Sequence, residues 1–187
     1  MYKRQTQAIG EIPVNVDEMG IDIMAFSAHK FYGPKGVGGL FLKKQPSRIA
    51  IAPQQVGGGQ ERGLRSGTLN VPGIVGLGKA AELCFEEMQG EQIRLRDIQQ
   101  ILETELKSSF QAAINGEAAL RLPNVSNVYF PTLRVESLLS AISEKIAVST
   151  GSACNSAPSE PSHVLTAMGL SKKRITNSLR FSWGRFT

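Results

Sequence analysis

Short apolar runs separated by glycine turns precede a long stretch of helical periodicity in this chain. Residues 22–27 form an apolar run typical of a buried strand, and residues 37–42, after the turn 33–36, predict the next strand. Apolar residues at three- and four-residue spacing then predict two helices. The first helix carries Ile74, Leu77, Ala81, Cys84 and Met88 on its apolar face, and the longer second helix carries Leu95, Ile98, Leu102 and Leu106.

The remainder of the chain alternates between strand-like patterns and helix-like patterns. Residues 125–130 predict a strand and residues 135–142 a helix, whereas the small residues of 149–158 favour neither and predict a loop.

The last segment predicts two capped helices and a strand. Ser159 is suited to cap a helix ending at Met168, and Ser171 to cap the next one. Residues 179–183 alternate with period two, which predicts a strand that buries Leu179, Phe181 and Trp183 and directs Arg180 to the opposite face.

Composition and hydropathy exclude several classes of protein. The 187 residues, 41% hydrophobic and 20% charged, suit one average domain. No apolar run approaches the roughly 18 to 20 residues of a membrane span, and the first residues lack the basic-then-apolar layout of a signal peptide, so we expect a cytoplasmic protein with no membrane partner. Two cysteines and two histidines support neither a disulfide framework nor a structural zinc site.

The excess positive charge lies in the last 27 residues. The chain carries 21 Lys and Arg against 16 Asp and Glu, and no acidic residue follows Glu160. We expect the basic run 172–174 to be exposed. A non-catalytic module that binds nucleic acid or an acidic scaffold through this tail is therefore one hypothesis.

The two cysteines differ in context. Cys84 lies on a helical apolar stripe, where a thiol behaves as a small hydrophobe. Cys154 lies among small residues, which favours an accessible nucleophile, although an ordinary surface cysteine or a thiol peroxidase or reductase fits the same context.

Two basic residues are further candidates for chemistry. Lys30 follows His29 at a predicted strand end and could form a Schiff base, although most lysines are solvated surface charges. Arg180 could clamp a carboxylate with its planar guanidinium, although a solvated arginine is the commoner case.

Four segments together resemble the cysteine desulfurases of the NifS and IscS type: 27–36, 57–68, 149–154 and 179–182. The resemblance implies the α/β fold of a pyridoxal-phosphate (PLP) enzyme of fold-type I, like aspartate aminotransferase. Residues 1–75 would form the C-terminal part of the large cofactor domain, and residues 76–187 an α+β small domain. Family members are about twice as long, so we expect a fragment, with residues 1–5 a candidate for foreign sequence.

The resemblance also implies roles for single residues. Lys30 would be the Schiff-base lysine and Arg180 the ligand of the substrate carboxylate. Cys154 would carry the persulfide and could transiently ligate a nascent iron-sulfur cluster. The remaining cofactor contacts would come from Ser27 and His29 at the phosphate, Gln7 at the ring oxygen, and Thr68 at the phosphate of the other subunit's cofactor.

The implied reaction converts L-cysteine to L-alanine in a homodimer, with an iron-sulfur scaffold or another sulfur acceptor as partner and no nucleic acid. Selenocysteine lyase or another class V aminotransferase activity is the alternative among relatives. Arg4 stands where the family has an aspartate that pairs with the pyridine nitrogen. We therefore expect this chain alone to bind PLP poorly and to have little desulfurase activity.

Overall fold

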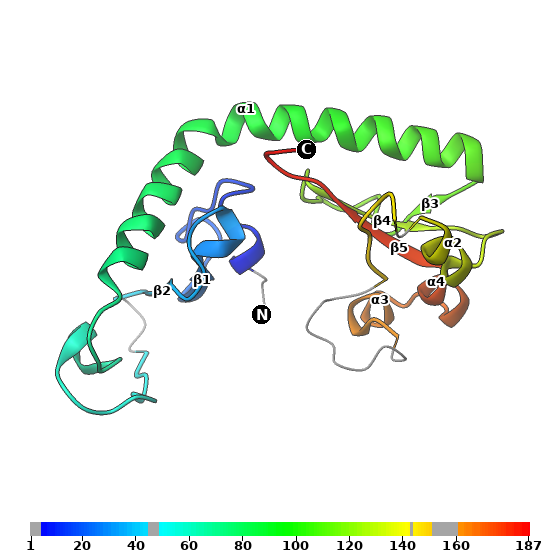
Figure 1. Ribbon diagram of the computed structural model, residues 1–187. Coiled ribbons are helices and arrows are strands. Elements are labelled where there is room, and N and C mark those ends of the chain that lie inside the picture. Colours follow the sequence, from blue (N-terminus) through cyan, green and yellow to red (C-terminus); the bar gives the residue numbers. More distant parts are fainter. Residues whose placement is uncertain (1–4, 45–48, 143, 151–160) are drawn as a thin grey trace. The chain divides into compact units, whose positions relative to one another are not determined.

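The computed structural model describes residues 5–44, 49–142, 144–150 and 161–187 (Figure 1). The chain divides into two compact units, Met1–Gln89 and Gly90–Thr187.

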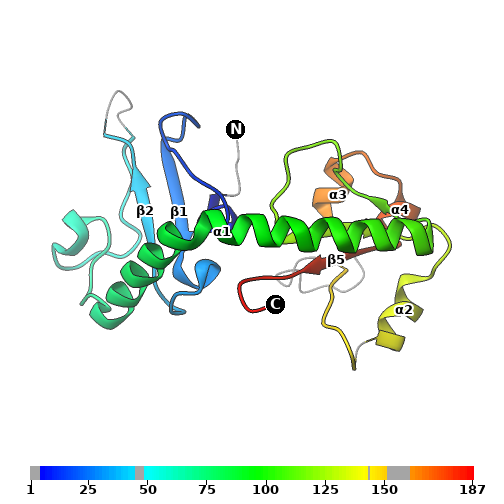
Figure 2. The ribbon, with the colours of Figure 1, turned by 90° about the horizontal axis from the view of Figure 1, so that it is seen from above.

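The first unit contains an antiparallel pair of strands (Figure 2). Strand β1 (Ile23–Ser27) pairs with β2 (Gly38–Leu42), and Ser27 lies opposite Gly38. Both predicted strands are confirmed. The expectation that the first is buried is wrong for this chain, because Met24 alone among the residues of β1 is buried.

The core of the first unit lies beneath the turn that follows β1. Buried Ala28 and Phe31 pack against Ala80 and Cys84. The Cys84 side chain is 4% exposed and its Sγ donates to the Phe31 carbonyl at 3.7 Å, which confirms its prediction as a core residue. Gly33 makes a close approach here, since a Cβ at this position would lie 2.9 Å from the Cβ of Ala28.

A single helix, α1 (Val71–Phe110), replaces the two predicted helices. It begins after Asn70, whose Oδ1 accepts from the Gly73 amide at 3.1 Å. Gly90 does not end it, because an interior glycine costs only about 1 kcal/mol and no proline follows. On the predicted apolar face Cys84 is buried and Leu77 and Met88 are half-buried, but Ile74 and Ala81 are exposed, and Ala80 is buried in place of Ala81.

The second unit is built on an antiparallel sheet in the order β3-β4-β5. Strands β4 (Val125–Tyr129) and β5 (Ser178–Ser182) confirm the two predicted strands and pair with Val125 opposite Ser182. The two-residue strand β3 (Ala113–Ile114) at the edge was not predicted.

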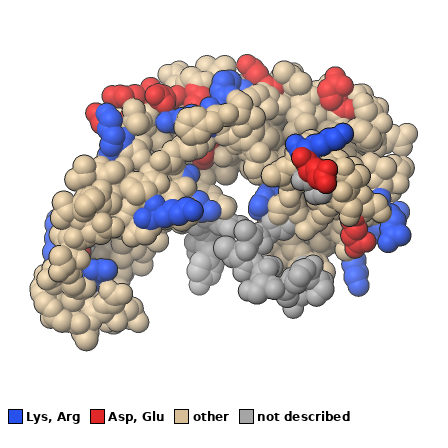
Figure 3. All heavy atoms as spheres, in the orientation of Figure 1, with Lys and Arg blue, Asp and Glu red and all other residues tan. Residues whose placement is uncertain are grey.

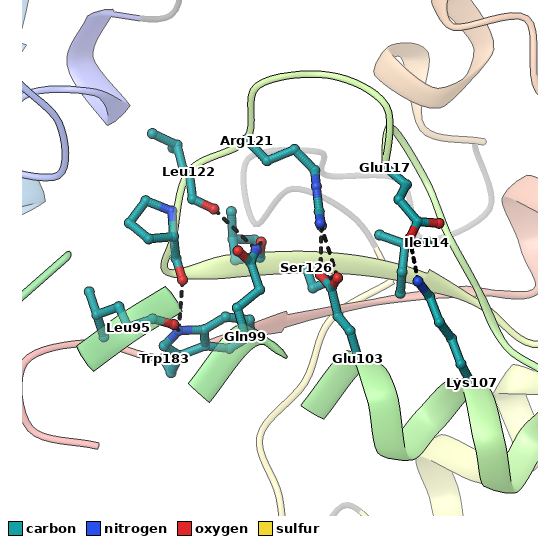
Figure 4. A network of polar contacts seen from close by, with 12 residues as sticks. Leu95, Gln99, Glu103, Lys107, Ile114, Glu117, Arg121, Leu122, Ser126 and Trp183 are labelled. Atoms are coloured by element: carbon teal, nitrogen blue, oxygen red, sulfur yellow. Dashed lines mark hydrogen bonds and ion pairs between the residues drawn. The ribbon is translucent and has the colours of Figure 1, made fainter. Parts of the chain in front are cut away.

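One face of this sheet forms the core of the second unit. Val128, Phe130 and Leu179 are buried there with Ala112, Ile114 and Val135. Trp183 is 9% exposed and its Nε1 donates to the carbonyls of Leu95, at 3.2 Å, and Pro123, at 2.9 Å (Figure 4). The predicted burial of Leu179 and Trp183 is confirmed, whereas Phe181, predicted to be buried with them, is half-buried.

A network of charged and polar side chains links α1 to the sheet on the same face (Figure 4). The Arg121 guanidinium donates to both carboxylate oxygens of Glu103, at 2.6 and 3.0 Å, and the Ser126 hydroxyl donates to Oε1 at 2.6 Å. Burial alone would raise the pKa of the Glu103 carboxyl, but the hydrogen bonds from Arg121 and Ser126 outweigh it and hold that pKa below its ordinary value.

Three short helices complete the second unit. Helix α2 (Val135–Ile142) has its predicted bounds, and Ser171 caps α4 (Lys172–Thr176) as predicted. Helix α3 (His163–Ala167) is capped by Ser162, whose Oγ accepts from the Leu165 amide, so the predicted start at Ser159 is wrong. Ser159 itself lies outside the described residues.

Two of the five basic residues of the tail are engaged within the second unit. Arg185 forms an ion pair with Glu91 at 3.0 Å, and Arg174 hydrogen bonds to Asn115 at 2.6 Å, so the expectation that Arg174 is an exposed surface charge is wrong. Within each unit, as drawn in Figure 3, the described Lys and Arg side chains form separate groups rather than one stripe. No helix among the described residues has the length and apolar character to cross a membrane.

Candidate active site

The end of β1 carries three of the predicted site residues. Ser27 is the last residue of the strand, and His29 and Lys30 lie in the 3-10 helix η2 (Ala28–Phe31). Because Ala28 and Phe31 are buried, the turn is anchored at both ends while His29 and Lys30 are exposed. The Ser27 Oγ and the His29 Nδ1 lie 2.8 Å apart, within hydrogen-bond distance. The structure thus brings these two predicted phosphate ligands together beside Lys30.

Gln7 lies in the 3-10 helix η1 (Gln5–Gln7), which packs along β1. The neighbouring Thr6 fixes this segment, because its Oγ1 donates to the Ala25 carbonyl at 2.7 Å. Ala25 precedes Ser27 by two residues in β1, so the Gln7 segment lies beside the same strand. Arg4 lies outside the described residues.

The glycine-rich segment 57–68 folds into a loop held by its own polar groups. Ser66 Oγ donates to the Gly58 carbonyl at 2.5 Å, and the Gly67 amide donates to Gln60 Oε1 at 3.2 Å. The loop contains the 3-10 helix η3 (Gln60–Gly63) and ends at exposed Thr68. Among the described residues, no hydrogen bond joins Thr68 to the group at the end of β1.

Arg180 occupies the middle of β5 in the second unit. Its amide donates to the Ser149 carbonyl at 2.6 Å, and the Ser149 amide donates to the Arg180 carbonyl at 3.2 Å. The predicted loop 149–158 therefore begins beside Arg180. Cys154 lies within that loop and outside the described residues.

A second polar cluster, which the sequence analysis missed, lies near Arg180. Asn115, Asn127, Arg174 and Ser178 are joined by hydrogen bonds on the sheet face opposite the core. The alternation of residues 125–129 was the available signal, because it places Asn127 on the face away from buried Ser126 and Val128. Among the described residues, no group of three His, Cys, Asp or Glu side chains is placed to hold a metal ion.

The family of the chain follows from comparison with known sequences. The family model described as aminotransferase class-V matches residues 5–187, and the chain belongs to that family. Its curated relatives include the cysteine desulfurases IscS of Klebsiella pneumoniae (strain 342) and of Salmonella newport (strain SL254). Each is 46% identical over 182 residues, which are 97% of this chain and 45% of the relative. The chain thus spans a little under half the length of these relatives.

Solved structures agree with this assignment. The NifS-like protein from Rickettsia africae ESF-5 matches with a TM-score of 0.82 and 33% identity, over 96% of this chain and 46% of that protein. Another NifS-like protein matches with a TM-score of 0.79 and 38% identity, over 94% of this chain and 44% of that protein. The resemblance to NifS- and IscS-type proteins and the predicted α/β fold class are confirmed.

Proposed function

We propose that this chain is part of a PLP-dependent cysteine desulfurase, which converts L-cysteine to L-alanine and leaves the sulfur as a persulfide on Cys154. The observation that carries the proposal is the 46% identity to IscS cysteine desulfurases across 97% of the chain. A relationship of this extent covers every segment that holds a candidate site residue, from Gln7 to Arg180.

The donor set at the end of β1 fits the proposed cofactor. A hydroxyl and an imidazole 2.8 Å apart can bind phosphate oxygens, and the exposed amine of Lys30 follows directly in the same turn. Ser27 and His29 would thus hold the phosphate, Lys30 would hold the aldehyde carbon, and Gln7 would contact the ring oxygen. When bound, PLP supplies the electron sink for a carbanion at the substrate Cα.

Three residues of this chain would act on the substrate. Arg180 would hold the L-cysteine carboxylate, and the Lys30 amine would move the proton at Cα. The Cys154 thiolate would attack the substrate sulfur, so that an S–S bond forms while the C–S bond breaks and its electron pair stays on carbon, which becomes the methyl group of alanine after protonation.

The assembly and partners belong to the same proposal. The enzyme would be a cytoplasmic homodimer in which Thr68 reaches the phosphate in the other subunit, and the persulfide would pass to an iron-sulfur scaffold or another sulfur acceptor. Residues 1–75 would contribute to the cofactor domain and residues 76–187 to the small domain. Since the relatives are more than twice as long, we expect the 187-residue chain alone to bind PLP poorly and to release little alanine.

The test compares substitutions of two lysines from the same turn region, each made in a PLP-loaded protein that includes these 187 residues. Lys30→Arg should lower alanine release from L-cysteine by a factor of about 100 or more, as expected for loss of a proton-transfer group. Lys35→Arg, at an exposed position five residues away, should leave the rate unchanged. Equal rates for the two variants would contradict the role of Lys30.

A further inference from the structure

Asn127 and Arg180 are direct neighbours on the sheet face opposite the core. They are register partners across β4 and β5. The Arg180 amide and carbonyl both bond to Ser149, so toward β4 this is a non-hydrogen-bonded pair, the type with the shorter Cα separation of about 4.5 Å and the closer side chains. Arg180 is half-buried, and within the described residues its guanidinium has no hydrogen-bond partner.

The hydrogen-bond polarity of the cluster around Asn127 is set by Arg174. The Arg174 Nε can only donate, so its partner on Asn115, at 2.6 Å, must be the amide oxygen. The Asn115 Nδ2 is then the donor, to Ser178 Oγ at 2.9 Å and to Asn127 at 2.5 Å. The atom of Asn127 that accepts must be Oδ1, and the free end of the Asn127 amide must be its NH2 group.

The cluster is rigid because its anchors are buried. Asn115 is 5% exposed and Ser178 is fully buried, and the Ser178 hydroxyl donates to the Arg174 carbonyl at 2.6 Å. The Arg174 guanidinium also lies 5.4 Å from the centre of the Tyr129 ring. These contacts hold the Asn127 amide in one orientation, and within the described residues its NH2 group has no acceptor.

We propose that Asn127 is a second substrate-binding residue, which donates a hydrogen bond from its NH2 group to the same carboxylate that Arg180 holds. Arg174 and Asn115 are positioning residues, because they fix which end of the Asn127 amide faces the substrate. The inference rests on the proposed function through Arg180. A neutral hydrogen-bond donor beside a guanidinium favours the binding of a carboxylate over the binding of an uncharged ester or amide. Asn127 therefore increases the selectivity of the site for free amino acids.

Calorimetric binding to a PLP-loaded protein that includes these residues tests the role of Asn127. The probes are L-alanine and L-alanine methyl ester, which differ only in the carboxylate. Because a hydrogen bond to a charged group contributes roughly 10- to 100-fold to binding, Asn127→Ala should raise the Kd for L-alanine by about that factor and that for the ester by less than about 3-fold. Ser182→Ala, two residues from Arg180 on the same strand and exposed, is the matched control and should change neither Kd.

The outcomes separate the two proposals. If Asn127→Ala changes both Kd values equally, or neither, the carboxylate role of Asn127 is wrong. The desulfurase proposal is tested independently by alanine release from L-cysteine in the unsubstituted protein. An active protein whose Asn127→Ala variant still binds L-alanine like the Ser182→Ala variant would overturn this inference and leave the proposed function standing.

Discussion

Replacing Glu103 should expose how strongly the second unit depends on its charged network. The Glu103 side chain is 10% exposed, and Arg121, which donates to both its oxygens, is 23% exposed. The Ser126 hydroxyl supplies a third hydrogen bond to the same carboxylate. Glu103→Ala removes all three acceptor contacts and leaves a partly buried guanidinium without its counter-charge.

The expected cost follows from these contacts. Hydrogen bonds to charged groups contribute about 1.5 to 3 kcal/mol each, and breaking a fully buried ion pair costs about 3 to 5 kcal/mol. Because Arg121 retains partial access to water, we place Glu103→Ala below that range, at a loss of about 2 to 3 kcal/mol in the free energy of unfolding.

Urea denaturation of the single and double variants measures this loss. In a double-mutant cycle with Arg121→Ala, the coupling free energy should be at least about 1 kcal/mol. The matched control is Arg134→Ala, which removes a 3.5 Å ion pair to Glu136 in which both side chains are more than 80% exposed, and it should cost less than about 0.5 kcal/mol. A coupling near zero, or a Glu103→Ala cost equal to the control, would refute the reasoning.

The same network predicts a pH dependence. Since the pKa of Glu103 is lower in the folded state than in the unfolded state, its contribution is complete above the unfolded-state pKa and is lost as the pH falls through the folded-state pKa. The difference in unfolding free energy between the wild type and Glu103→Gln should therefore be largest near neutral pH and shrink in acid.

Three further substitutions test the packing. Gly33→Ala introduces a Cβ 2.9 Å from that of Ala28 and should destabilise the first unit by about 1 to 3 kcal/mol in thermal unfolding. Gly78→Ala, in open space on α1, should instead stabilise it by about 0.5 to 1 kcal/mol. Stability changes of the same sign in both variants would be inconsistent with the packing. Trp183→Phe keeps an aromatic ring, smaller than the indole, but leaves two buried carbonyls without their indole donor, and should lower the urea midpoint by the equivalent of about 1 to 3 kcal/mol. An unchanged midpoint would mean that these bonds contribute nothing.

Local sequence patterns predicted most elements because their physical causes are local. The strands around the turn 33–36 were predicted from apolar runs and a glycine turn, and the Ser171 cap from a side chain close to its own backbone. The single helix α1 was not predictable in the same way. The apolar positions on either side of Gly90 stay in phase, since Met88 and Leu95 are seven residues apart, but a glycine can either end a helix or lie within one, and the local pattern does not distinguish the two cases.

The candidate site was predictable in part. The 2.8 Å contact between Ser27 and His29 joins residues two apart in the chain, so their proximity follows from the turn at the strand end. Arg174 was misjudged because its partners, Asn115 and Tyr129, lie 59 and 45 positions earlier in the sequence and meet it only through the sheet. Asn127 was missed for the same reason, since its register opposite Arg180 is a property of strand pairing.

The most direct measurement of the proposed function is mass spectrometry of a PLP-loaded protein that includes these 187 residues, after incubation with L-cysteine and mapping of added sulfur by residue. The account predicts one additional sulfur atom on Cys154, lost in Cys154→Ser and retained in Cys84→Ser, because the Cys84 thiol is buried against Phe31. Sulfur on Cys84, or alanine release that persists undiminished in Cys154→Ser without any persulfide, would contradict it.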